Sequence, residues 1–244
     1  MSTAASPITL QAALNGFLTA GDHPMLPLSP RELAADASEC VVAGADAFHV
    51  HPRDADGRQT LDPEAVDAAV RAIRGATGQL VGVSTSQEIE ADPATRLAQI
   101  GAWTEPDYAS VNLSEADAAD VIFLLLEHGI EIEAGLWSVG DVEALAATGL
   151  AHRVARVLIE PAGDDAEQAL AMTEAIHEAL DAHGITSQRL QHSDGLAAWP
   201  VLDDALRRGL ATRIGFEDTL HLRHGTAADS NADLVHAVKL TVLS

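Results

Sequence analysis

Residues 29–51 read SPRELAADASECVVAGADAFHVH and contain one complete helix-to-strand unit. Pro30 follows a serine, which is typical of the first turn of a helix, and Gly44 is typical of a left-handed cap at a helix end. We therefore expect a helix over residues 30–43. The alternation of apolar and polar residues that follows predicts a strand over residues 46–51.

The same alternation of short strands and longer helices continues along the chain. We expect strands at residues 8–14, 46–51, 79–84, 108–113, 129–134, 154–160, 188–193 and 211–217. We expect helices at residues 30–43, 63–76, 93–103, 115–128, 139–148, 165–183, 196–209 and 228–242. Eight strands, each followed by a helix, are the count of an α/β (β/α)8 TIM barrel, here a single domain over residues 1–244. An open doubly wound sheet is the alternative, but no Gly-rich phosphate-binding fingerprint follows the first predicted strand.

The composition narrows the classes of function. The 244 residues include 14 basic and 37 acidic side chains, and the net charge of −23 would repel phosphate backbones and anionic membranes. We expect no nucleic-acid partner and no membrane span, and residues 1–8 do not resemble a signal peptide. The single cysteine excludes an internal disulfide and fits a reducing cytoplasm. The single lysine, Lys239, falls in a predicted helix, which argues against Schiff-base and PLP chemistry.

The most informative motif for function is His49-x-His51 in the second predicted strand. Side chains at positions i and i+2 of a strand project from one face. Strands two and eight both flank strand one in a closed barrel, so Glu217, at the end of the last predicted strand, converges with the two histidines. Two imidazoles and one carboxylate suit Zn²⁺ with an open coordination position, or Fe²⁺ as a facial triad. The alternative is a hydrogen-bonded pair of interior histidines.

Other polar residues face the barrel interior near predicted strand ends. Arg213 shares a face with Glu217 and Asp218 follows directly, so Arg213 and Asp218 could orient a proton-transfer group or form a structural ion pair. A cluster of hydroxyl side chains ends the third strand and could bind a substrate carboxylate, although helix capping would explain it as well. The residues of this cluster and of the remaining predicted pocket lining are Ser84, Thr85, Ser86, Ser110, Asn112 and Glu133.

Residues 26–54, LPLSPRELAADASECVVAGADAFHVHPRD, resemble the signature of the β-keto acid cleavage enzymes, in which a helix start, an Ala-Gly-Ala and an HxHxRD motif follow one another. Further similar stretches are Ala13-Leu14-Asn15-Gly16, Ser84-Thr85, Val111-Asn112, the run 213–218, and Ser230-Asn231-Ala232. The resemblance implies a (β/α)8 barrel, a homo-oligomer that is usually a tetramer, and one zinc ion per chain on His49, His51 and Glu217. It also implies exchange of a β-keto acid with acetyl-CoA, which gives acetoacetate and a new CoA thioester.

The same resemblance implies roles for the polar residues. Ser84 and Ser110 would hold polar groups of the keto acid. Asp218, oriented by Arg213, would support proton removal before a Claisen-type addition and a retro-Claisen cleavage. Ser86 and the residue after it stand where the family commonly has two glycines, so contacts to an anionic group differ there. The alternatives are a metal-dependent hydrolase, a CoA-independent carbon–carbon lyase acting on a small carboxylate, and a barrel that only binds a metal or a small molecule.

Overall fold

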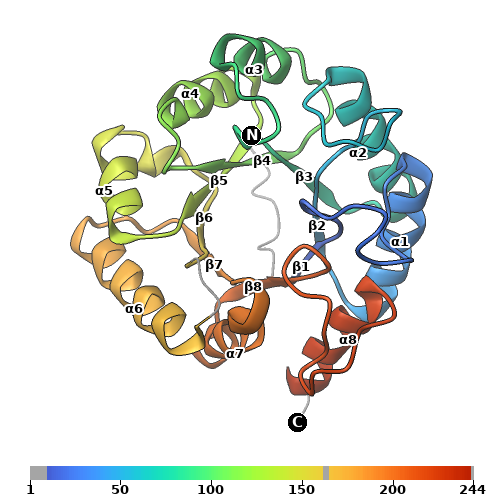
Figure 1. The fold of residues 1–244 in the computed structure, drawn as a ribbon. Coiled ribbons are helices and arrows are strands. Elements are labelled where there is room, and N and C mark those ends of the chain that lie inside the picture. The colour runs from blue at the N-terminus through green and yellow to red at the C-terminus, as the bar shows by residue number, and fades with distance from the viewer. Residues whose placement is uncertain (1–9, 162–164, 243–244) are drawn as a thin grey trace.

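Eight parallel strands form a closed barrel in the computed structural model, which describes residues 10–161 and 165–242 (Figure 1). The strands pair in chain order, and β1 closes the barrel by pairing with β8. Their bounds are β1 Leu10–Ala13, β2 Ala47–Val50, β3 Leu80–Ser84, β4 Tyr108–Asn112, β5 Glu131–Leu136, β6 Arg156–Ile159, β7 Gln188–Gln191 and β8 Ala211–Ile214. This arrangement confirms the predicted barrel; the first two residues of the strand expected at 8–14 lie outside the described residues.

A ring of helices surrounds the strands, one after each strand (Figure 1). Their bounds are α1 Pro30–Ala43, α2 Pro63–Thr77, α3 Pro93–Ile100, α4 Ala118–His128, α5 Val139–Ala147, α6 Ala166–Ala182, α7 Ala198–Arg208 and α8 Asn231–Val242. Single turns of 3-10 helix precede β6 at Ala151–Arg153 and α7 at Gly195–Ala197.

Helix α1 begins and ends where its sequence signals place it. Ser29 and Glu32 form a capping box, in which the Ser29 hydroxyl accepts from the Glu32 backbone N–H and the Glu32 carboxylate accepts from the Ser29 backbone N–H. Gly44 ends the helix in the left-handed conformation, with a φ of +117°. Strand ends differ more from expectation: the strand predicted at 211–217 stops at Ile214 and a turn follows.

The two faces of the strands differ, as their alternation predicts. Outward residues such as Phe48 and Val50 are fully buried against the helices and belong to one large apolar cluster. The barrel interior holds a smaller apolar cluster around Tyr108 and Leu158, together with a set of polar side chains. Barrel enzymes have their active sites at the carboxyl ends of the strands, so the polar side chains at that end are the candidate catalytic and binding residues.

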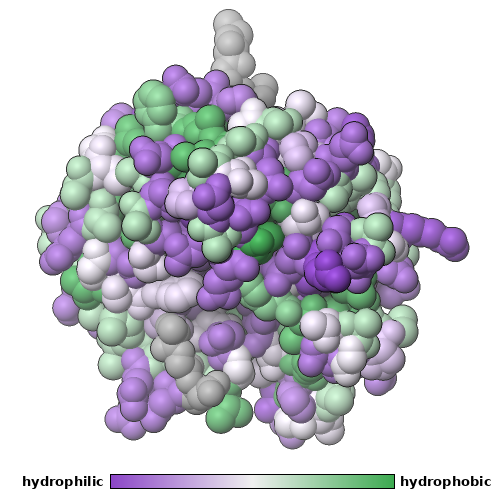
Figure 2. All heavy atoms as spheres, turned by 45° about the horizontal axis from the view of Figure 1, so that its top comes forward, coloured by the Kyte–Doolittle hydropathy of each residue, from purple (hydrophilic) through white to green (hydrophobic). Residues whose placement is uncertain are grey.

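The chain carries a net charge of −23, and both hydrophilic and apolar residues reach its surface. In Figure 2, hydrophilic residues cover much of the visible face and apolar residues form small, scattered patches. Within the two described ranges, no helix is both long enough and apolar enough to cross a membrane.

Candidate active site

Three side chains with metal-binding atoms meet at the carboxyl end of the barrel. His49 lies on β2 and His51 directly follows that strand, while Glu217 lies in the turn after β8. Strand β1 joins the two ends, because Ala13 pairs with His49 and its carbonyl accepts the Glu217 backbone N–H. The Nε2 atoms of His49 and His51 lie 3.7 Å and 3.6 Å from Glu217 Oε1. One ligand atom from each of the three residues lies within 4.8 Å of the other two.

The hydrogen bond of one imidazole and the pKa of the other suit a metal site. His51 Nδ1 lies 2.5 Å from Gln59 Oε1, an acceptor, so Nδ1 carries a proton and Nε2 is the ring nitrogen that faces Glu217. Burial lowers the pKa of His49 to about 3, which keeps that imidazole neutral at physiological pH. Two imidazoles and one carboxylate fit a zinc ion that keeps one coordination position open for substrate.

Two neighbours of Glu217, Arg213 and Gly16, determine its charge and its position. Arg213 on β8 donates from Nη2 to Glu217 Oε1 at 2.9 Å. Burial alone would raise the pKa of Glu217, but the positive charge of Arg213 is the largest of the effects that outweigh burial and hold this pKa well below its usual range. On the other side, Gly16 lies so close that a Cβ atom there would sit 2.8 Å from Glu217 Cβ. Only a glycine leaves this space to the metal-binding side chain.

A cavity of about 80 Å³ opens beside these three residues. Two aromatic side chains, Phe17 and Trp137, are 48% and 41% exposed, which places the open side of the cavity next to them. Phe17 packs edge-on against the His51 ring, with ring centroids 4.9 Å apart. The lining residues are Phe17, His49, His51, Ser84, Ser86, Ser110, Asn112, Trp137, Leu158, Glu160, Arg213 and Glu217. Most of the residues expected at the site therefore meet in one cavity.

Thr85 and Glu133, both expected in the pocket lining, lie outside this cavity. Thr85 is fully buried, and its hydroxyl donates to the Ser110 carbonyl at 2.7 Å. Glu133 is fully buried farther down β5, where it accepts from Arg156 Nε at 2.5 Å and from Gln11 Nε2 at 2.7 Å. Strand alternation correctly turns Glu133 into the barrel interior, but alternation does not fix how far along the barrel axis a side chain lies.

Asp218 also lies outside the cavity, behind Arg213. Its Oδ1 atom accepts from Arg213 Nε at 3.1 Å and from Nη2 at 2.8 Å, and its side chain is 1% exposed. Burial raises the pKa of Asp218, against the opposing effect of Arg213. Arg213 thereby links Asp218 to Glu217, and the negative charge of Glu217 raises the pKa of Asp218.

Glu160 and Trp137 line the cavity, although the sequence analysis does not identify them as functional residues. Glu160 directly follows β6, and its Oε1 accepts from Trp137 Nε1–H at 2.8 Å. Its Oε2 lies 3.0 Å from His192 Nε2, and His192 Nδ1 lies 3.6 Å from Asp218 Oδ1. Alternation along β6 offers a signal, because Glu160 falls on the same face as the inward Arg156.

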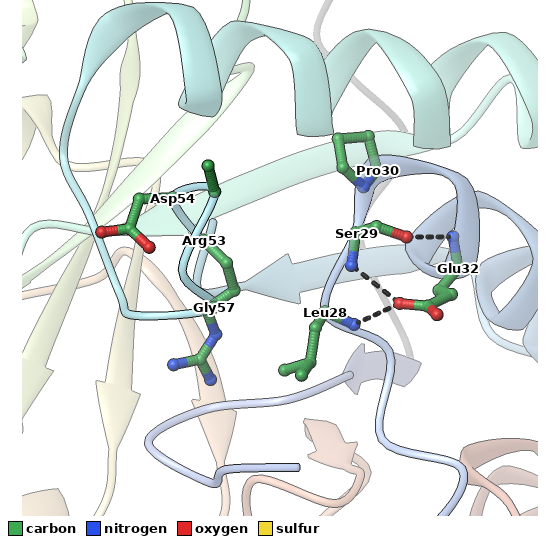
Figure 3. Close-up of a pocket in the computed structure, with 8 residues that line it drawn as sticks. Leu28, Ser29, Pro30, Glu32, Arg53, Asp54 and Gly57 are labelled. Atoms are coloured by element: carbon green, nitrogen blue, oxygen red, sulfur yellow. Dashed lines mark hydrogen bonds between the residues drawn. The ribbon is translucent and has the colours of Figure 1, made fainter.

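Arg53, in the HxHxRD motif, ties the loop after β1 to the loop after β2. Its Nη2 atom donates to the carbonyl oxygens of Gly16 at 2.6 Å and Leu18 at 2.9 Å, which holds the intervening Phe17 against the cavity. A second cavity, of about 370 Å³, lies beside Arg53, between the N-terminus of α1 and the loop after β2 (Figure 3). The other charged residues that line this second cavity are carboxylates, so it is a poor site for an anion.

Comparison with known proteins matches almost the whole chain to one family. The family described as beta-keto acid cleavage enzyme matches residues 7–242. Two similar proteins are both 3-keto-5-aminohexanoate cleavage enzymes. The one from Fusobacterium nucleatum subsp. nucleatum is 24% identical over 266 residues, which cover 95% of this chain and 89% of the relative. The one from Acetoanaerobium sticklandii is 24% identical over 251 residues, which cover 95% and 90%.

Solved structures share the barrel at lower sequence identity. ObcA in a ternary complex with a C4-CoA adduct and oxalate superposes with a TM-score of 0.72 and 17% identity. The match covers 90% of this chain but 64% of ObcA, so the chain spans less than two thirds of that protein. The N-acetylmannosamine-6-phosphate 2-epimerase from Clostridium perfringens has a TM-score of 0.59 and 10% identity, covering 86% and 87%. These structures support the fold, whereas the match over residues 7–242 settles the ancestry: the chain belongs to the beta-keto acid cleavage enzyme family.

Proposed function

We propose that this protein is a zinc-dependent β-keto acid cleavage enzyme that exchanges a β-keto acid with acetyl-CoA to give acetoacetate and a new CoA thioester. The observation that carries the proposal is the convergence of His49, His51 and Glu217 beside a polar cavity, in a chain of this family. Their donor set supports one divalent ion per chain. A zinc ion bound there would polarise the keto group of the substrate.

The chain's own side chains would bind and orient the keto acid. Ser84, Ser86 and Ser110 line the cavity with hydroxyl groups, which can hold the carboxylate and keto oxygens. Arg213 donates to Glu217 and holds it in place, and it also donates to Asp218 behind the cavity wall. From that position Asp218 would support removal of a proton from the keto acid without contacting it.

The size of the cavity bears on how acetyl-CoA would enter. A volume of about 80 Å³ accommodates the reacting atoms of a small keto acid and not a whole CoA thioester. The acetyl group would therefore approach from the open side, next to Phe17 and Trp137, while the rest of CoA stays outside. Following the family resemblance of the sequence, we also propose a homotetramer.

A panel of β-keto acids, incubated with and without acetyl-CoA, tests this function. Acetoacetate formation that requires both the keto acid and acetyl-CoA supports the proposal, and Glu217→Gln protein serves as the control without an intact metal site. Keto acid turnover that does not require acetyl-CoA would replace it with a hydrolase or a simple lyase. A lack of turnover with the zinc-loaded wild type across the panel would contradict an enzyme of this class.

A further inference from the structure

Glu160 brings a further carboxylate into the candidate active site. It directly follows β6, and its backbone N–H donates to the Leu136 carbonyl at 3.1 Å, so the main chain around it is fixed by β5. In the closed eight-stranded barrel, β6 lies four strands away from β2. Glu160 therefore lines the cavity from the side opposite His49.

Gly135 on β5 makes room for this carboxylate. A Cβ atom at Gly135 would lie 2.5 Å from Glu160 Oε1 and 2.9 Å from Asn112 Oδ1. Gly135 lies inside a strand and has no left-handed backbone that would require glycine. Glycine in a strand interior costs stability and often marks a close approach of other groups. The space left by the absent side chain is thus occupied by the polar end of Glu160.

One oxygen of Glu160 accepts a hydrogen bond, and the other lies beside an imidazole. Trp137 donates to Oε1 at 2.8 Å, and His192 Nε2 lies 3.0 Å from Oε2. His192 Nδ1 in turn lies 3.6 Å from Asp218 Oδ1, which accepts from Arg213. The chain Glu160–His192–Asp218 therefore joins one carboxylate that lines the cavity to another that is 1% exposed.

We propose that Glu160 is a catalytic residue that contacts the keto acid and exchanges its α-proton, while His192 and Asp218 act behind it as positioning residues. This inference rests on the proposed function. A base must lie within hydrogen-bond reach of the proton that it removes. Of Glu160 and Asp218, the two carboxylates beside His192, only Glu160 lines the cavity.

The α-proton moves to Glu160 in the first step and returns to the product in the last. The C–H bond of the α-carbon breaks, its electron pair forms the C=C bond of an enolate, and an O–H bond forms on Glu160. The enolate carbon attacks the thioester carbonyl of acetyl-CoA and expels the CoA thiolate. The thiolate adds to the β-carbonyl of the original keto acid, and cleavage of the adjacent C–C bond releases the new thioester and the enolate of acetoacetate. That enolate takes the proton back from Glu160.

Exchange of the α-protons of acetoacetate in D₂O, followed by ¹H NMR without acetyl-CoA, isolates the proton transfer from the later steps. After subtraction of the spontaneous rate, Glu160→Gln should lower the exchange rate by about 10²-fold or more, the usual scale for a lost acid–base group. Its zinc content and its affinity for acetoacetate should stay within a few-fold of wild type. The matched control is Glu131→Gln, which neutralises an exposed carboxylate at the start of β5 and should exchange at the wild-type rate.

A second variant tests the same geometry with Glu160 intact. Gly135→Ala should displace the Glu160 carboxylate and slow exchange as well, and it decides the question if Glu160→Gln protein does not fold. Wild-type exchange in Glu160→Gln would overturn the inference while leaving the proposed function standing, and loss of exchange in Asp218→Asn alone would assign the base to Asp218. If zinc-loaded wild type neither exchanges acetoacetate nor turns over keto acids with acetyl-CoA, the proposed function fails, and this inference fails with it.

Discussion

Replacing Gly16 by alanine should weaken metal binding without touching a metal ligand. A Cβ atom at this position would lie 2.8 Å from Glu217 Cβ and 3.1 Å from its Cα, whereas ordinary contacts begin at 3.4 Å. Glu217 or the loop must therefore retreat by several tenths of an ångström. Metal–ligand distances tolerate only about 0.2 Å. We expect the affinity for Zn²⁺ to fall by about 10- to 100-fold, as when the support of a ligand is removed.

Gly57→Ala is the matched control for this prediction. Both glycines have a positive φ, +49° at Gly16 and +79° at Gly57, so alanine costs roughly 1–2 kcal/mol of backbone strain at either position. Within the described part of the chain, no atom would lie within 4 Å of a Cβ at Gly57. Competition with a chromophoric chelator gives the zinc affinity, and thermal unfolding gives the strain. If Gly16→Ala binds zinc as tightly as Gly57→Ala, Glu217 is not held where the metal site requires it.

Three further changes test other parts of the account. Burial lowers the pKa of His49 from 6.5 to about 3. Between these pH values, in metal-free protein, the unfolded chain binds a proton that the folded chain excludes. The free energy of unfolding should therefore fall as the pH drops from 6.5 towards 3. His49→Gln should reduce this slope in urea titrations, and an unchanged slope would assign it to other groups. Arg53→Lys should loosen the loop that carries Phe17, so amide exchange in that loop should become faster and KM should rise more than kcat falls. Unchanged amide exchange there would show that the hydrogen bonds of Arg53 do not hold the loop. Glu133→Gln leaves Arg156 buried without its partner, so it should lower stability by about 3–5 kcal/mol in denaturant titrations with KM unchanged, whereas a large rise in KM would return Glu133 to the substrate site.

The fold could be predicted from the sequence because the residues that start and end its helices and strands act locally. Helix α1 needs only its own cap residues, and the capping box of Ser29 and Glu32 forms within one turn. The two histidines share a face because side chains alternate along any strand. Glu217 could be joined to them because the chain order of a barrel places strands two and eight on either side of strand one. These inferences use sequence neighbours or topology and need no side-chain packing.

Contacts between strands could not be predicted in the same way. Glu133 and Glu160 both face inward, yet one pairs with Arg156 inside the barrel and the other reaches the cavity. What separates them is position along the barrel axis, together with the space that Gly135 leaves on a neighbouring strand. Thr85 adjoins two cavity-lining serines, but its hydroxyl bonds the Ser110 carbonyl instead. Strand alternation assigns a face and carries no information about such partners.

The metal content of purified protein, measured by inductively coupled plasma mass spectrometry together with turnover, decides whether the barrel holds a catalytic zinc ion. We expect one zinc ion per chain in the wild type and a large loss of zinc in the His49→Ala/His51→Ala double variant and in Glu217→Gln, because each change removes donor atoms from a site of three ligands. Turnover of the keto acid should fall with the zinc, and adding zinc to stripped protein should restore it in the wild type but not in the double variant. Full zinc occupancy in the double variant, or full turnover by metal-free wild type, would contradict the account.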